Sequence, residues 1–267
     1  MLRRMLRTAM AVPLLAVGIP LALSAQAPMA GGFPGRSIEA NALAQSVTNG
    51  YGDWSGVYVR AVQPGTRDTW YVDALALRAF GERGLQVGTT QRHDWTSRIF
   101  QMIGANVGSG AAIMPRGRVD GAVGLRLGAT KAWQTTVGLS YVKSVTELSD
   151  MAGVASLAWY TPRAIVIDVG VRYNISRPGN VRSHRFTNTT MWTPSARRSF
   201  SLRLGGGTEG WQVIRTGTTL RQFHSQDAAL SWREKVTTSL ALSLQADWYQ
   251  NPFYARSGVT LGVARYW

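Results

Sequence analysis

Serine and histidine side chains could form a hydrolytic site, but this chain offers few of them in a suitable arrangement. It has three histidines, of which His184 directly follows Ser183 and His224 directly precedes Ser225. Neighbouring residues of a strand point to opposite faces, so neither pair forms a dyad as written. Pairing of His184 with a serine on another strand stays open as an alternative. We therefore predict no catalytic residues and no enzymatic activity.

Metal and cofactor sites are also not indicated by the residue pattern. Cysteine is absent, which excludes disulfides and thiolate ligands. There is no His-x-His pair and no cluster of acids with the spacing of a calcium site. The glycine run Gly205–Gly207 is not followed by a helix pattern, so it is not a phosphate loop. We predict no metal and no cofactor.

Charged residues that alternate with apolar ones are the best functional lead. In the segment Ala164–Asn174, Asp168 and Arg172 lie on the face opposite a row of isoleucines and valines. A charge facing lipid near the membrane centre costs about 2–4 kcal/mol, so such residues should face inward. The predicted lumen-lining residues are Asp120, Arg126, Asp168, Arg172, Arg203, Arg221, Asp227 and Asp247.

The same alternation recurs along most of the chain in segments of about ten residues, which is the sequence form of a transmembrane β-barrel. The clearest segments are Val119–Ala129, Trp133–Tyr141, Ala164–Asn174, Arg197–Gly206, Val236–Trp248 and Val259–Trp267. We predict an all-β, antiparallel, up-and-down transmembrane barrel of about fourteen strands. The weakly alternating Glu39–Thr48 supplies the first strand. Twelve strands remain an alternative if two weak segments merge or lie outside the wall.

The beginning of the chain has the features of an export signal. Three arginines precede an apolar run, and Ala25-Gln26-Ala27 fits the small-x-small cleavage rule. We predict a signal peptide over residues 1–27, a flexible leader over 28–38, and an outer-membrane β-barrel over 39–267. An N-terminal membrane anchor is the alternative for the first segment. Nothing after residue 27 is long and apolar enough for a transmembrane helix.

Short and long connections alternate between the segments, as expected for periplasmic turns and outer loops. Aromatic residues should mark the membrane interfaces. The predicted girdle near the short turns is Trp70, Trp95, Trp133, Trp159, Trp192, Trp232 and Trp267. Gly207–Thr219 is expected to be a solvated outer loop, with folding into the barrel or stacking on sugars as alternatives. Arg116 and Arg118 are expected at a basic outer tip.

The charge balance predicts an anionic partner. The formal net charge is +15, and the first 27 residues contribute only three arginines to it. Nucleic acid is the general partner of basic proteins, but an exported barrel would not meet it. We expect the partners to be outer-membrane lipids and lipopolysaccharide, with an anionic polysaccharide as a further candidate.

The chain resembles the YaiO family of outer-membrane β-barrels over residues 40 to 267. The resemblance rests on Asn49–Trp54, on Arg78–Arg83 and on Ser176–His184. It implies a single barrel in the outer membrane of a Gram-negative bacterium, and envelope or polysaccharide-related functions without a catalytic motif. The aromatic C-terminus, Trp267, is similar to the signal read by the barrel-assembly machinery, although Arg265 stands where that signal usually has an aromatic or apolar residue.

Three functional hypotheses follow from the sequence. The first is a porin-like channel, or an accessory factor, for passage of an anionic or sugar-rich envelope component, because lumen arginines would attract anions. The second is a non-conducting structural or surface-receptor barrel whose arginine–aspartate pairs fill the lumen. The third and least favoured is an outer-membrane lipid hydrolase.

Overall fold

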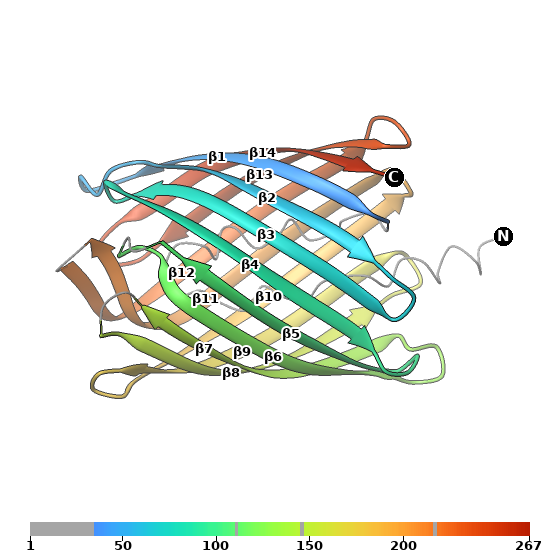
Figure 1. Cartoon of the computed structure of the whole chain (residues 1–267), viewed down its shortest axis with the longest axis horizontal. Coiled ribbons are helices and arrows are strands. Elements are labelled where there is room, and N and C mark those ends of the chain that lie inside the picture. Colours follow the sequence, from blue (N-terminus) through green and yellow to red (C-terminus); the bar gives the residue numbers. More distant parts are fainter. Residues whose placement is uncertain (1–34, 110–111, 145–146, 216–217) are drawn as a thin grey trace.

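The strands of this protein form one closed antiparallel barrel (Figure 1). The computed structural model describes residues 35–109, 112–144, 147–215 and 218–267, and these ranges contain fourteen strands. Each strand pairs with its neighbour in sequence, and the first pairs with the last from Ser37 opposite Tyr266 to Val47 opposite Arg256. Closure leaves no sheet edge with unpaired backbone groups. The predicted all-β barrel is confirmed, with fourteen strands rather than twelve.

The strand bounds show where each crossing of the wall begins and ends. The strands are β1 (Ser37–Val47), β2 (Trp54–Pro64), β3 (Asp68–Ala79), β4 (Glu82–Asp94), β5 (Ile99–Gly108), β6 (Pro115–Leu127), β7 (Trp133–Ser144), β8 (Ser149–Tyr160), β9 (Ile165–Arg177), β10 (Val181–Ser195), β11 (Arg198–Arg215), β12 (Thr218–Lys235), β13 (Leu240–Gln250) and β14 (Ala255–Tyr266).

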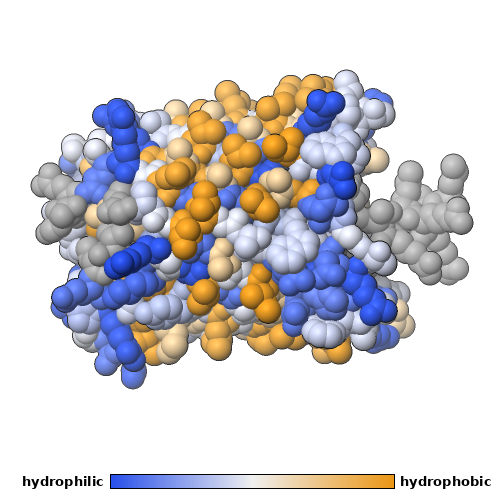
Figure 2. Space-filling view, in the orientation of Figure 1, coloured by the Kyte–Doolittle hydropathy of each residue, from blue (hydrophilic) through white to orange (hydrophobic). Residues whose placement is uncertain are grey.

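The two faces of the wall follow the period-two pattern of the sequence. In β13, Ala241, Ser243 and Gln245 are buried inside the barrel, whereas Leu242 and Leu244 are exposed on the outside. Exposed large apolar residues lie on strands throughout the barrel, and on the face shown in Figure 2 they form a band between two hydrophilic ends. A band of this kind matches the hydrocarbon layer of a membrane. Within the described residues, no helix is long and apolar enough to span a membrane.

The two ends of the barrel can be told apart by the chain termini. Trp267 donates its backbone N–H to the carbonyl of Arg36 at one end, which we call the inner end because both termini of such barrels lie in the periplasm. The predicted girdle tryptophans lie near the inner end, six exposed and Trp232 partly exposed. Trp133 and Trp159 are cross-strand partners that stack with ring centroids 5.5 Å apart.

Two of the expected element boundaries in the C-terminal half of the chain differ in the structure. The prediction of a solvated outer loop over Gly207–Thr219 is wrong. Strand β11 continues to Arg215 and β12 begins at Thr218, so the two strands form a long outer hairpin. The expected strand start at Val236 is also wrong, since the Val236 N–H bonds to the Leu240 carbonyl at 2.9 Å in a tight turn.

The beginning of the chain is only partly visible in the structure. The predicted signal peptide lies outside the described residues. The first strand β1 begins at Ser37, inside the segment expected to be a leader, and it includes most of the weakly alternating Glu39–Thr48. This segment alternates poorly because alanines occupy its outward positions, which leaves little contrast between its two faces.

Candidate functional site

The inner face of the wall carries a system of paired charges along the length of the barrel. Arginine and carboxylate side chains meet on the lumen face, and most of them are shielded from solvent. Arg92–Asp94 and Arg118–Asp120 lie within β4 and β6, and the other pairs join different strands. The pairs with their N–O distances are Arg60–Asp73 at 2.6 Å, Arg92–Asp94 at 3.2 Å, Arg126–Asp94 at 2.8 Å, Arg118–Asp120 at 2.7 Å, Arg185–Glu209 at 2.8 Å, Arg203–Asp227 at 3.3 Å and Arg233–Glu39 at 2.6 Å.

The densest part of this system lies between β10, β11 and β12. Asp227 accepts hydrogen bonds or ion pairs from Arg185 and from Arg203. The same Arg185 also contacts Glu209, whose carboxylate accepts from the Tyr249 hydroxyl at 3.1 Å. Pairing of this kind offsets the cost of placing charges in a barrel interior. It also leaves the lumen lined by groups of both signs.

Most of the predicted lumen residues lie on this inner face. Asp120, Arg126, Arg203 and Asp227 belong to the pairs above, and Asp247 accepts from Gln45 at 2.8 Å. Two others lie on this face without an ion pair in the described part of the chain. Arg172 donates to Ser140 at 3.2 Å, and a buried oxygen of Asp168 has no protein partner there.

Arg221 is placed differently from the other predicted lumen residues. Its side chain is exposed on the outer part of β12, with its guanidinium 5.0 Å from the centre of the Trp211 ring. The long β11–β12 hairpin carries it beyond the paired charges. Arg118 was expected to be exposed at an outer tip, but it is buried beside Asp120.

Several lumen residues were missed by the sequence analysis. Most of them occupy inward positions in the alternating pattern of their strands, so the same pattern could have predicted them. They are Glu39, Arg60, Asp73, Arg92, Asp94, Arg185, Glu209, Arg233 and Arg256. Glu39 lies in the weakly alternating first strand, and Glu209 lies in the segment that was expected to be a loop.

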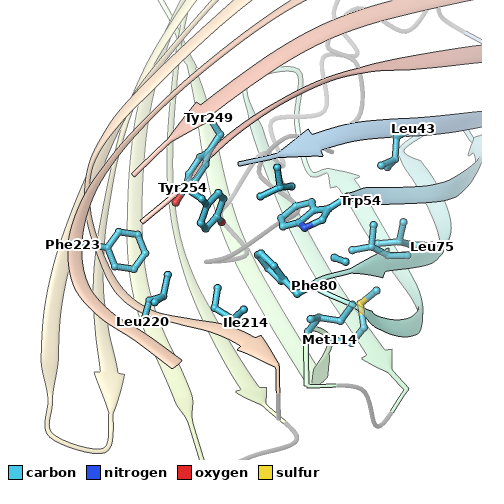
Figure 3. Packing of buried hydrophobic residues seen from close by; sticks show 14 residues of the cluster. Leu43, Trp54, Leu75, Phe80, Met114, Ile214, Leu220, Phe223, Tyr249 and Tyr254 are labelled. Carbon is cyan, nitrogen blue, oxygen red and sulfur yellow. The ribbon is translucent and has the colours of Figure 1, made fainter. Parts of the chain in front are cut away.

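An apolar cluster occupies the outer end of the lumen, which we call the outer closure (Figure 3). It is built from strand ends, turns and the β5–β6 connection rather than from a separate domain. Its members are Leu43, Val47, Trp54, Leu75, Leu77, Ala79, Phe80, Ile113, Met114, Ile214, Leu220, Phe223, Tyr249 and Tyr254. Thus apolar side chains gather inside the barrel only a short way from the buried charges.

Aromatic rings form the centre of the outer closure. Phe80 meets Trp54 edge to face with centroids 4.9 Å apart, and meets Tyr254 at 5.7 Å. Phe80 and Gly81 form the two-residue turn between β3 and β4, with φ values of 53° and 82°. This left-handed backbone is suited to a tight hairpin. In Figure 3 the Phe80 ring points toward Trp54 and Tyr254.

The β5–β6 connection is tied into the outer closure by polar and apolar contacts. The backbone N–H of Ala112 donates to a carboxylate oxygen of Glu82 at 2.9 Å. Met114 packs against Gly84 of β4, where an added Cβ would come within 2.3 Å of the Met114 side chain. Gly84 therefore provides the space in which Met114 packs.

Arg256 marks the boundary between the outer closure and the polar lumen. Its guanidinium carbon lies 4.0 Å from the centre of the Trp54 ring and 5.1 Å from that of Tyr249. Contacts of a guanidinium with aromatic faces are favourable. Nearby, Gln212 donates to the Tyr254 hydroxyl, and burial raises the pKa of that hydroxyl well above its usual value. Tyr254 therefore stays neutral in the closure.

The histidines and acids do not gather into a reactive group. The Nδ1 atom of His93 lies 2.9 Å from Asp68 at the inner end, and that of His184 lies 3.3 Å from the Thr208 hydroxyl. Across the described ranges, no group of three or more histidine, aspartate or glutamate residues is arranged to hold a metal ion.

Comparisons with known proteins agree on the architecture. The channel for monoaromatic hydrocarbons CymD has a TM-score of 0.62 at 6% identity, with 91% of this chain and 90% of that chain covered. Omp33 of Acinetobacter baumannii has a TM-score of 0.52 at 10% identity, covering 87% and 99% of the two chains. A bacterial polysaccharide outer membrane secretin has a TM-score of 0.51 at 8% identity, covering 87% and 98%.

The sequence comparisons give the family. None of the curated proteins matches this chain significantly. The profile of the YaiO membrane beta barrel domain matches residues 35–212, which is more than half of the chain. This protein therefore belongs to the YaiO membrane β-barrel family, and it is a barrel of the Gram-negative outer membrane.

Proposed function

We propose that this barrel is a gated channel for an anionic or sugar-rich component of the cell envelope, with the outer closure as its gate. The observation that carries the proposal is the division of the lumen. Polar and charged side chains line the wall along most of its length, whereas the apolar cluster occupies only the outer end. A hydrophilic path closed by an apolar constriction is a known way to gate a pore by dewetting.

The unpartnered polar atoms of the wall support a hydrated or solute-filled path. Among the residues that the structure describes, buried atoms without a protein partner include an oxygen of Asp168, a nitrogen of Arg172, the amide nitrogen of Gln134 and an oxygen of Asp247. Buried polar groups are rarely left without any hydrogen bond. Water or the hydroxyl and carboxylate groups of a passing solute would satisfy them.

The chemistry of the wall suits sugars and anions. Guanidinium groups, such as that of Arg172 on the lumen face, bind carboxylates and phosphates with two parallel hydrogen bonds. The likeness to a polysaccharide secretin is a likeness of fold, and its name agrees with this substrate class.

A second candidate follows from the pairing of the lumen charges. If the arginine–carboxylate pairs fill the lumen as a permanent network, the barrel would be a non-conducting scaffold or surface receptor. CymD is named as a channel for monoaromatic hydrocarbons, which differ from the anionic or sugar-rich solutes proposed here. An apolar aromatic solute would suit the outer closure better than the charged wall. We propose no enzymatic role, because the Nδ1 atoms of His93 and His184 contact Asp68 and Thr208 rather than a serine.

Single-channel recording separates the two candidates. The barrel would be refolded in detergent, shown to be folded by its shifted electrophoretic mobility, and inserted into a planar bilayer. The channel proposal expects brief openings in the wild type and long openings when the closure is weakened. A folded barrel that stays silent even with a weakened closure would instead be a scaffold. Added acidic oligosaccharide should block the openings, whereas a monoaromatic hydrocarbon should not.

A further inference from the structure

Two pairs of arginines at the outer end remain unexplained by the lumen and its closure. Arg78 and Arg83 flank the turn between β3 and β4, and Arg177 and Arg182 flank the turn between β9 and β10. Both pairs have the same spacing, with four residues between the arginines, and both lie within the segments that carry the family resemblance. All four side chains are exposed.

The first pair places two like charges directly opposite each other. Arg78 is the register partner of Arg83, and both alternate with inward residues, so they point outward. Like charges opposite each other on neighbouring strands are destabilising unless something compensates them. In the described part of the chain, neither arginine forms an ion pair or a side-chain hydrogen bond.

The second pair repeats this arrangement on another part of the barrel. Arg182 is the register partner of Ile175, and Arg177 lies two residues farther along the same outward face of β9. The two arginines are therefore diagonal neighbours, within reach of each other's long side chains. As for the first pair, no carboxylate among the described residues makes an ion pair with either of them.

Apolar side chains lie below each pair on the outside of the wall. Beneath Arg83 on β4 are Leu85 and Val87, which are 52% and 45% exposed. Below Arg182 on β10 the next outward residue is His184, and Phe186, which is 61% exposed, follows it. The pairs thus lie at the outer strand ends, above exposed apolar residues of the same wall. A ligand there would present negative charge to the arginines and hydrocarbon to the band below.

We propose that Arg78 with Arg83, and Arg177 with Arg182, are two binding sites for the phosphate groups of lipid A in the outer leaflet. A phosphate between two guanidinium groups would accept bidentate hydrogen bonds from each of them and would cancel their repulsion. The acyl chains would then lie along the exposed leucine, valine and phenylalanine side chains. The tight turns hold both members of each pair on the outer wall, so the sites are already formed before the lipid binds.

The test compares two double variants and their quadruple combination with a matched control. R78Q/R83Q and R177Q/R182Q each remove one site, and R163Q/R197Q removes two exposed arginines from the turns of the inner end. Folding of every variant is checked by heat-modifiable electrophoretic mobility. Binding of diphosphorylated lipid A to the folded barrel in detergent is measured by native mass spectrometry, and its affinity by titration.

The proposal expects two bound lipid A molecules for the wild type and the control. It expects one for each double variant, and an affinity for the quadruple variant that is lower by about tenfold or more. Unchanged binding by the folded quadruple variant would overturn it. Equal binding of dephosphorylated lipid A would also overturn it, because the acyl chains alone would then be recognised. Full displacement of lipid A by inorganic phosphate at equal concentration would assign the sites to free phosphate instead.

Discussion

Phe80 meets Trp54 edge to face inside the outer mouth, with ring centroids 4.9 Å apart. Phe80 holds this position from a turn with a φ of 53°, which is costly for a bulky residue, about 1–3 kcal/mol. Its contacts with Trp54 and Tyr254 offset part of this cost, at about 0.5–1.5 kcal/mol for each aromatic pair. These contacts therefore hold the ring in the mouth, in the position that the proposed gate requires.

We expect Phe80→Gly to lengthen the openings of the channel. Glycine adopts the same positive φ without strain, so the turn should persist while the aromatic centre of the closure is lost. Single-channel recording should show an open probability raised by about tenfold, which corresponds to the loss of about 1.4 kcal/mol from the closed state.

The control for this variant is Phe186→Ala, which removes a phenylalanine ring from the lipid-facing wall. Its open probability should match that of the wild type. Equal behaviour of Phe80→Gly and Phe186→Ala would mean that the aromatic cluster does not gate the lumen.

We expect Arg172→Gln to shift the ion selectivity of the open channel toward cations. In the described residues this arginine makes no ion pair, and its side chain donates to Ser140 at 3.2 Å on the lumen face. One charge about 8 Å from a passing ion in water contributes about 0.5 kcal/mol, which is a factor of about two in relative permeability. Reversal potentials in a salt gradient measure this ratio, and Arg163→Gln at an inner turn should leave it unchanged.

We expect Arg233→Gln to destabilise the barrel strongly. Arg233 on β12 donates to both carboxylate oxygens of Glu39 on β1 at 2.6 Å, and to the Tyr266 hydroxyl on β14 at 3.0 Å. The substitution leaves a buried carboxylate without its cation, at a cost of about 3 kcal/mol. Denaturant unfolding in lipid vesicles measures this loss.

Two further variants test whether the cost comes from the unpaired charge. Adding Glu39→Gln to Arg233→Gln should restore much of the stability, since the orphaned carboxylate is then removed. Arg198→Gln breaks the exposed pair with Glu234 and should change the unfolding free energy much less. A similar loss in Arg198→Gln and Arg233→Gln would show that burial of the pair is unimportant.

We expect Gly124→Ala to disturb the arginines around Phe100. A Cβ at Gly124 would come within 2.0 Å of the Phe100 ring, and that ring lies 4.1 Å from the guanidinium of Arg92. Relieving the overlap requires the ring to move, at about 1–3 kcal/mol of stability. On the same strand, Gly121 faces outward with no atom near its added Cβ, so Gly121→Ala should be neutral in the same unfolding measurement.

The barrel architecture could be predicted from the residue pattern alone. Strict alternation placed Asp168 and Arg172 on the inner face and the tryptophans near the strand ends, because a lipid-facing charge is costly and the side-chain period of a strand is two. These are local properties, readable within about ten residues. Counting such segments predicted about fourteen strands with twelve as the alternative, and the structure shows fourteen among the described residues.

Only the tertiary structure decided which inward residues meet. Arg233 and Glu39 are 194 positions apart, and Gln45 and Asp247 are 202 apart, so their contacts depend on barrel closure and on the register of every strand between them. The sequence pattern likewise did not predict the outer closure. Ile214 was expected in a solvated loop, but the long β11–β12 hairpin places it in the cluster that contains Phe80. Apolar burial depends on neighbours that the local pattern does not contain.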